Sequence, residues 1–473
     1  MWKNLARTLL KFATIKTMNK GFVIPAALGI VVLILGIGIL YVARPKHESP
    51  VLSPEAALKE DVREDILPGK EQSVKEQTQI GTQELGAIPQ KVEPQPKPQS
   101  QQSPWGSFFG NTFGDQRPSW EILTEKEKAQ LPDCKNPLLT LPPVPLDSIT
   151  AIEPIGSSNP PEHTLASISS DTYIGVTGQG TTQTTPLVAP GDMWIILIQP
   201  RYGVTQDPED HVIKYAFCKD VYGVVDHVKS FSPEMKALVD AYTCPNSRSK
   251  PGDSDCPVLL LEPIKAGTPL GTVGRLQGNF NFGTWDLRIT HNFISPKRHG
   301  QLSLHSACPF NYYSSPLRET LSGKLEREGK DGSCGTVLYD IPGTLQGDWF
   351  VGDAVIFRYA DWPKLLFFGT DNRFPSQSVI AASGMFISKP TKWLFAAQSS
   401  GKTNRRFDQV TADGSLYCYD NNGAHPYKNY EKGVVSGRII VQMTSATELH
   451  VEYQEGLCGD PYWQFSNPTI YTR

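Results

Sequence analysis

One uncharged stretch near the N-terminus constrains this chain of 473 residues more than any other feature. No charged side chain occurs in residues 21–43, where a helix with a rise of about 1.5 Å per residue would cross a hydrocarbon core of roughly 30 Å. Basic side chains and no acidic ones precede this run. By the positive-inside rule, we expect residues 1–20 to be cytoplasmic, residues 21–43 to span the membrane, and the remainder to lie outside.

A cleaved signal peptide is the alternative reading of the same run. The run is longer than an ordinary signal-peptide core, and no A-x-A-like cleavage site closes it. We therefore expect an uncleaved signal anchor, with the N-terminus inside and the C-terminal head in the periplasm or at the cell surface. The membrane would be the partner of residues 21–43.

Residues 44–125 differ in composition from the rest of the chain. They are rich in Pro, Gln, Glu, Lys and Ser, with QKVEPQPKPQSQQSP as the extreme, and they contain few apolar residues. Such a segment cannot bury enough apolar surface to fold. The sequence predicts a disordered stalk here.

Short strands dominate the sequence beyond the stalk. The whole chain is 39% hydrophobic and 20% charged, with 40 glycines and 39 prolines, which suits strands and turns better than helices. WEILTEKEKAQL predicts one short helix, and the rest predicts a mostly β head with domains at residues 126–300 and 301–473. A net charge of −3 disfavours a nucleic-acid partner. The segments expected to be strands are MWIILIQ, VIKYAF, VLLLE, TWDLRI, AVIFRY, RIIVQM and LHVEY.

All eight cysteines follow the apolar run, and an even number in an exported chain indicates disulfide bonds. A zinc site made of cysteines is the competing reading, but no C-x-x-C spacing occurs. Cys244 with Cys256 is the expected local pair. The more distant pairs that we expect are Cys308 with Cys334 and Cys418 with Cys458.

Several phrases occur in a fixed order between about residues 150 and 300. They are VAPGDMWIILI, the lone histidine of GVVDHVKSFSP, the glycine-punctuated IKAGTPLGTVGRLQGN, and GTWDLRI. Together they resemble the lysostaphin/LytM-type zinc endopeptidases, whose core is a duplicated hybrid motif of short antiparallel strands. The resemblance implies that fold for the first domain. It also places His227 at the family's acid/base histidine, the candidate catalytic residue.

The resemblance fails at the metal ligands. Thr172 lies about where the first ligand histidine should be, and Thr284 and Asp286 replace both histidines of the family's H-x-H strand. Zinc hydrolysis needs about three protein ligands and an open position for water, and threonine is a poor ligand. The sequence therefore predicts a degenerate, non-peptidase domain without a cofactor, a pseudoenzyme.

Relocated ligands are the alternative. His163, Asp171 and Asp286 could form an altered metal site beside His227, for which mixed nitrogen and oxygen ligands suit zinc. His211 or His291 could serve as alternative ligands of this site. Because His163 and Asp171 are not spaced as in the family's H-x-x-x-D motif, the prediction favours no metal.

Three functions follow from these observations. The first is a binding or scaffolding protein of the cell envelope that recognises wall peptide, glycan or an envelope protein in the vacated groove around Thr284 and Asp286. The second is a metal-dependent cell-wall or protein endopeptidase with relocated ligands and zinc as cofactor. The third is a spacer without a ligand. Two tryptophans beside acids, Trp349 and Trp362, could stack on a sugar ring or could belong to the core.

Overall fold

The computed structural model describes residues 117–200, 210–245, 250–251, 256–275, 277–388, 390–420, 437–459 and 462–473. All of them belong to one compact unit, Lys97–Arg473. The predicted membrane span, and the predicted stalk up to residue 116, lie outside this described part. Within it, no helix has the length and apolar character needed to cross a membrane.

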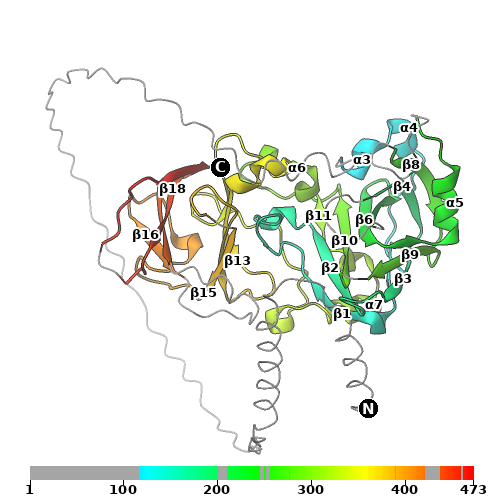
Figure 1. Ribbon diagram of the computed structural model, residues 1–473, viewed down its shortest axis with the longest axis horizontal. Coiled ribbons are helices and arrows are strands. Elements are labelled where there is room, and N and C mark those ends of the chain that lie inside the picture. Colours follow the sequence, from blue (N-terminus) through cyan, green and yellow to red (C-terminus); the bar gives the residue numbers. More distant parts are fainter. Residues whose placement is uncertain are drawn as a thin grey trace, which may run out of the picture. The chain divides into compact units, whose positions relative to one another are not determined.

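The described chain is mostly β, as expected, and its strands form two antiparallel sheets (Figure 1). The first sheet has the order β1-β2-β10-β6-β5-β4-β8, with β3, β7, β9 and β11 attached beside this path. Its strands are β1 (Ile149–Glu153), β2 (Asp171–Val176), β3 (Thr184–Val188), β4 (Met193–Pro200), β5 (His211–Cys218), β6 (Val221–Val228), β7 (Ser230–Phe231), β8 (Val258–Ile264), β9 (Pro269–Gly274), β10 (Asn279–Asp286) and β11 (Ser306–Ala307).

The second sheet has the order β15-β14-β13-β12-β19-β18-β17-β16. Its strands are β12 (Gly347–Phe350), β13 (Leu365–Thr370), β14 (Ser378–Ala382), β15 (Thr391–Phe395), β16 (Tyr417–Asp420), β17 (Gly437–Ser445), β18 (Glu448–Glu455) and β19 (Thr469–Thr472). The predicted boundary between residues 300 and 301 falls within a helix, α6, and stays a prediction.

Helices are few and short. They are α3 (Ser119–Ile122), α4 (Glu125–Lys128), α5 (Pro233–Ala241), α6 (Pro296–Leu304) and α7 (Leu317–Ser322). The single helix expected from WEILTEKEKAQL is wrong, because α3 and α4 are separate. Thr124 starts α4 with a capping box, in which its hydroxyl accepts the Glu127 N–H and the Glu127 carboxylate accepts the Thr124 N–H.

Most of the expected strands are present, and one expectation is wrong. MWIILIQ, VIKYAF, VLLLE, RIIVQM and LHVEY coincide with β4, β5, β8, β17 and β18, whereas TWDLRI is a strand only up to Asp286. AVIFRY is not a strand but a turn that leads into the 3-10 helix η5 (Tyr359–Lys364). The Asp361 carboxylate accepts the Val355 N–H at 3.1 Å, a local bond that competes with strand pairing.

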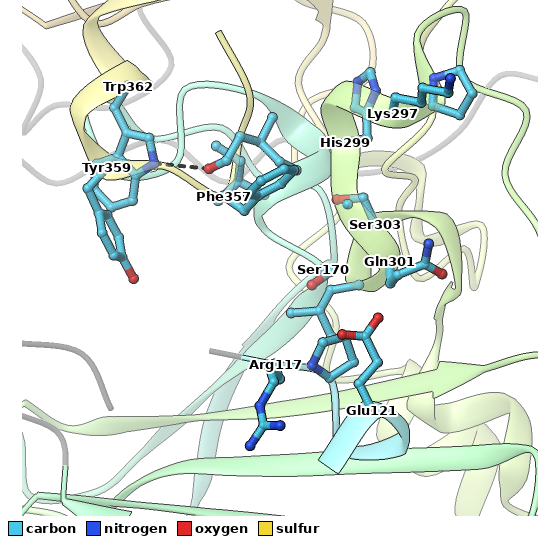
Figure 2. Close-up of a pocket in the computed structure, with 16 residues that line it drawn as sticks. Arg117, Glu121, Ser170, Lys297, His299, Gln301, Ser303, Phe357, Tyr359 and Trp362 are labelled. Carbon is cyan, nitrogen blue, oxygen red and sulfur yellow. Dashed lines mark hydrogen bonds between the residues drawn. The ribbon is translucent and has the colours of Figure 1, made fainter. Parts of the chain in front are cut away.

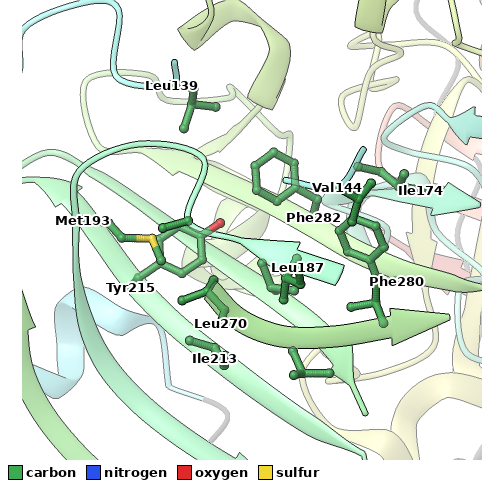
Figure 3. Packing of buried hydrophobic residues seen from close by; sticks show 14 of the residues in the cluster. Leu139, Val144, Ile174, Leu187, Met193, Ile213, Tyr215, Leu270, Phe280 and Phe282 are labelled. Carbon is green, nitrogen blue, oxygen red and sulfur yellow. The ribbon is translucent and has the colours of Figure 1, made fainter. Parts of the chain in front are cut away.

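The core of the first sheet holds its strands in register. Side chains from β2, β3, β4, β5, β9 and β10 meet in one buried cluster (Figure 3), whose bulkiest fully buried members are Tyr215, Phe280, Phe282 and Phe310. Gly223 on β6 lies against the Tyr215 ring, where a Cβ would come within 2.3 Å of a ring carbon. Only glycine therefore allows the tyrosine to pack there.

Four disulfide bonds cross-link the described chain. Cys244–Cys256, Cys308–Cys334 and Cys418–Cys458 confirm the expected pairs, and Cys134–Cys218 completes the set. No cysteine of the described residues is free. Disulfide bonds of this number indicate an extracytoplasmic or otherwise oxidising environment.

Candidate functional site

Of the three positions where the resemblance places zinc ligands, Thr172 and Asp286 make other hydrogen bonds, and the Thr284 hydroxyl makes none. Thr172 donates its hydroxyl to the Phe282 carbonyl at 2.9 Å, and Thr284 is fully buried. The Asp286 carboxylate accepts Arg288 Nε at 2.8 Å and the Tyr312 hydroxyl at 2.7 Å. Burial alone would raise the Asp286 pKa, but these bonds outweigh it and hold the pKa below its ordinary value.

This donor set does not fit zinc. Asp286 is already neutralised by a guanidinium, and two threonine hydroxyls do not replace imidazoles. Both Thr284 and Asp286 are also buried, at 0% and 4% exposure, so that their side chains offer little surface to a ligand. The ligand groove predicted around them remains a prediction.

The relocated ligands suggested by the sequence make separate contacts. His163 Nε2 lies 2.8 Å from the Tyr173 hydroxyl, His211 Nδ1 lies 3.3 Å from the Val228 carbonyl, and His291 Nε2 lies 2.8 Å from the Ser306 carbonyl. Among the residues that the structure describes, one group of three or more His, Cys, Asp or Glu side chains is close enough to share a metal ion. It contains none of His163, Asp171 and Asp286.

That group forms around His227, which occupies a bulge in β6. The β5–β6 register passes from His211 opposite Val228 to Val212 opposite Asp226, which leaves His227 as the extra residue. Its φ of 68° is in the left-handed region, which costs free energy for a non-glycine residue. The bulge brings the imidazole Nδ1 to 3.0 Å from Asp210 Oδ2.

The surroundings of His227 are buried and charged. Asp210, Asp226, His227 and Lys229 have exposures of 1%, 8%, 3% and 1%. Lys229 Nζ lies 3.3 Å from Asp210 Oδ2, and the Asp226 carboxylate accepts the His227 N–H at 2.8 Å. Two carboxylates and an imidazole are ligand types that divalent metals accept. The Lys229 ammonium already compensates the charge of Asp210, which lowers the affinity of this group for a metal ion.

Sequence reasoning found His227 but missed its partners. Asp226 and Lys229 flank it in D-H-V-K, and that local pattern was the available signal. Asp210 comes from the start of the neighbouring strand, and only the register of β5 against β6 brings it to the histidine.

A cavity of about 620 Å³ lies elsewhere, along α6 (Figure 2). This volume is within the range of about 300–1,000 Å³ that small-molecule sites occupy. Figure 2 shows Phe357, Tyr359 and Trp362 on one side and Arg117 with Glu121 on another. The remaining lining residues are Pro118, Ile168, Ser170, Pro296, Lys297, His299, Gly300, Gln301, Leu302, Ser303 and Ile356.

Phe357 and Tyr359 of the aromatic wall come from the segment AVIFRY that was expected to be a strand, and Trp362 follows it in η5. Phe357 is 62% exposed, although it is a large apolar side chain. Trp362 donates its Nε1–H to the Ile356 carbonyl at 3.2 Å, and Tyr359 packs edge-on against it with ring centroids 4.5 Å apart. The indole therefore has its one donor satisfied within the protein.

A kink in α6 allows this wall to approach the helix. Gly300 has φ 68° and ψ 166° inside α6, and a Cβ at this position would lie 3.2 Å from Phe357 Cδ1. Both the conformation and the close contact favour glycine.

A buried pair anchors α6 behind the cavity. His299 Nε2 lies 2.9 Å from Asp348 Oδ2 on β12, and Nδ1 lies 2.9 Å from the Ser295 carbonyl. Ser167, in the 3-10 helix η2 (Ala166–Ile168), donates to the same Asp348 oxygen at 3.0 Å. Burial alone would lower the His299 pKa, but the hydrogen bond and charge of Asp348 outweigh it and raise the pKa. The arrangement is not a nucleophilic triad, because the serine bonds the aspartate and not the imidazole.

Comparisons with known proteins add little to this geometry. No family model and no curated protein matches the chain. Among solved structures, two crystal forms of Helicobacter pylori Csd3 are similar at 12% identity. The match to the hexagonal crystal covers 37% of this chain and 33% of that chain, with a TM-score of 0.22. The match to the orthorhombic crystal covers 38% of each chain, with a TM-score of 0.20. The solution structure of lysostaphin is similar at 13% identity, covering 48% of this chain and 70% of that one, with a TM-score of 0.18. The chain thus spans only about a third of the length of Csd3.

Proposed function

We propose that this protein is a membrane-anchored, non-catalytic binding protein of the cell envelope, with its ligand site in the cavity along α6. The observation that carries the proposal is the aromatic wall of exposed Phe357 and half-buried Tyr359 and Trp362, which faces polar side chains across the cavity. A large exposed apolar side chain such as Phe357 is unfavourable in water and gains when a ligand covers it.

The ligand positions support the non-catalytic part of the proposal. Asp286 is engaged by Arg288 and Tyr312, and Thr284 cannot replace an imidazole. Residues 1–20 would form the cytoplasmic end and residues 21–43 the anchor. The predicted stalk of residues 44–125 would serve as spacer up to residue 116, because residues 117–125 belong to the folded head. This arrangement would hold the β-rich head outside the cytoplasmic membrane. Wall peptide, glycan and envelope proteins are the partners available there.

Sedimentation of the full-length protein with insoluble cell wall tests the proposal. We expect the protein to pellet with the wall, and Phe357→Ala to reduce the bound fraction. Tyr462→Ala is the matched control, because Tyr462 is an aromatic residue at 85% exposure outside the cavity. Equal binding by both variants and the wild-type protein would place the ligand elsewhere and refute the proposed site.

A metal-dependent hydrolase is the second candidate, and the group of Asp210, Asp226 and His227 favours it. Elemental analysis of the full-length protein after zinc loading and dialysis separates the two. Near-stoichiometric zinc that is lost in His227→Ala would support the hydrolase. Zinc lost in Asp286→Ala instead would point to the family's own position.

A further inference from the structure

We infer that the ligand of the cavity along α6 is an uncharged stretch of a saccharide chain, held by stacking on Phe357 and Trp362. The inference rests on the proposed function and specifies its ligand. It also gives a role to Trp362, one of the two tryptophans beside an acid. The other, Trp349, is fully buried in the core of the second sheet.

The aromatic wall offers apolar rings and no donor from its indole. Trp362 donates its Nε1–H to the Ile356 carbonyl, so the part of the indole that can contact a ligand is apolar and flat. Phe357 adds a second flat surface, seated on Gly300. The C–H face of a sugar ring is flat and apolar, and its hydroxyls point outward around the edge, so that it can cover both rings while its hydroxyls stay hydrogen-bonded.

The opposite side offers partners for hydroxyls. Glu121 and Gln301 line the cavity with planar carboxylate and amide groups, which donate or accept two hydrogen bonds in one plane. Ser303 uses its hydroxyl on the Ser167 carbonyl and is not available for this purpose. Vicinal hydroxyls of a sugar have a spacing that suits such planar groups.

The charges of the lining do not select a charged ligand. Arg117, Glu121 and Lys297 include both signs, and all three are exposed, so that water and salt screen them. The buried His299 is paired with Asp348 and directs neither nitrogen at the cavity. A charged ligand therefore gains no affinity over an uncharged one from these side chains.

An extended peptide fits this cavity less well. The lining residues belong to α6, to the neighbourhood of α3 and η2, and to the segment through η5, and none of them lies in a β-strand. A peptide bound by strand addition needs an open strand edge for its backbone groups, and this lining provides none.

Calorimetric titration of the full-length protein with two pools of wall fragments tests the inference. One pool contains glycan chains freed of peptide, and the other contains the peptides freed of sugar. We expect the glycan chains alone to bind, with an affinity that changes little between low and high salt. Phe357→Ala and Trp362→Ala should each weaken binding about tenfold or more, as for a central aromatic contact, and Tyr462→Ala should leave it unchanged.

Each other outcome has a definite meaning. Binding of the peptide pool alone, sensitive to Phe357→Ala, would overturn the saccharide inference and leave the proposed binding function intact. Glycan binding that persists in both aromatic variants would also overturn it, because the stacking would play no part. Binding of neither pool, together with failure to sediment with intact wall, would refute the proposed function as well. Because Phe357 is exposed, its variant should fold normally even if Trp362→Ala does not.

Discussion

The buried contact between His299 and Asp348 gives the sharpest prediction about stability. Both imidazole nitrogens face acceptors, the Ser295 carbonyl and the Asp348 carboxylate, which favours a proton on each nitrogen and a cationic ring. Burial opposes the charge of the partner and raises the pKa of Asp348. Phe293 stacks on this ring with centroids 3.9 Å apart and planes 13° from parallel, which further favours the charged form. Asp348→Asn keeps the shape of the side chain and removes only the charge.

The expected loss can be estimated from the burial of the pair. His299 is 1% exposed and Asp348 3% exposed, and removing one partner of a buried ion pair costs about 3–5 kcal/mol. Because the asparagine can still accept a hydrogen bond, we expect Asp348→Asn to lower the free energy of unfolding by about 3 kcal/mol, the lower end of this range. Asp192→Asn is the control, because its pair with Lys265 is exposed and is worth about 1 kcal/mol or less.

The same pair makes stability depend on pH with a definite sign. The His299 pKa is raised in the folded protein above its unfolded value of about 6.5. The stabilisation is therefore complete below pH about 6.5 and is lost as the pH rises through the folded pKa. Urea unfolding of the full-length protein at several pH values should show this loss in the wild type. It should be absent from Asp348→Asn. Equal pH dependence in both, or a cost below about 1 kcal/mol, would refute a buried ion pair.

Three further predictions concern other parts of the head. Gly300→Ala should weaken ligand binding, because it strains a left-handed residue and displaces Phe357; calorimetric titration with wall glycan measures this. Lys229→Met should cost about 3–5 kcal/mol in urea unfolding, because it leaves the buried Asp210 without its ammonium, and a neutral result would mean that other groups compensate this carboxylate. Cys418→Ser should cost about 2–5 kcal/mol by the same measurement, and a strong reductant, which opens all four disulfide bonds, should lower the stability of the wild-type protein further than this single substitution does.

Elements that depend only on nearby residues could be predicted from the local sequence pattern. Alternating and continuous apolar runs predicted β4, β5 and β17, and they are buried as such runs should be. Pairing of cysteines close in sequence was also predictable, because a short connection keeps the two thiols near each other. Cys134–Cys218 depends on the fold and was not foreseen.

Long-range geometry explains what the sequence did not reveal. Asp210 reaches His227 only through the register of two strands and a bulge. AVIFRY is a short apolar run typical of a buried strand, but the Asp361 carboxylate accepts the Val355 N–H in a turn, and Phe357 is exposed. The candidate cavity could therefore not be predicted, because two of its aromatic residues lie in the segment that was wrongly predicted to be a strand. The metal ligands missing at Thr172 and Thr284 were visible in the sequence itself.

The central claim is that the head binds the cell wall without cleaving it. The most direct test incubates the zinc-loaded full-length protein with purified insoluble wall and measures both bound protein and released soluble fragments. The account predicts bound protein, reduced by Phe357→Ala, and no fragments above the level of a protein-free control. Fragment release that disappears in His227→Ala would contradict it and would establish a hydrolase that depends on His227.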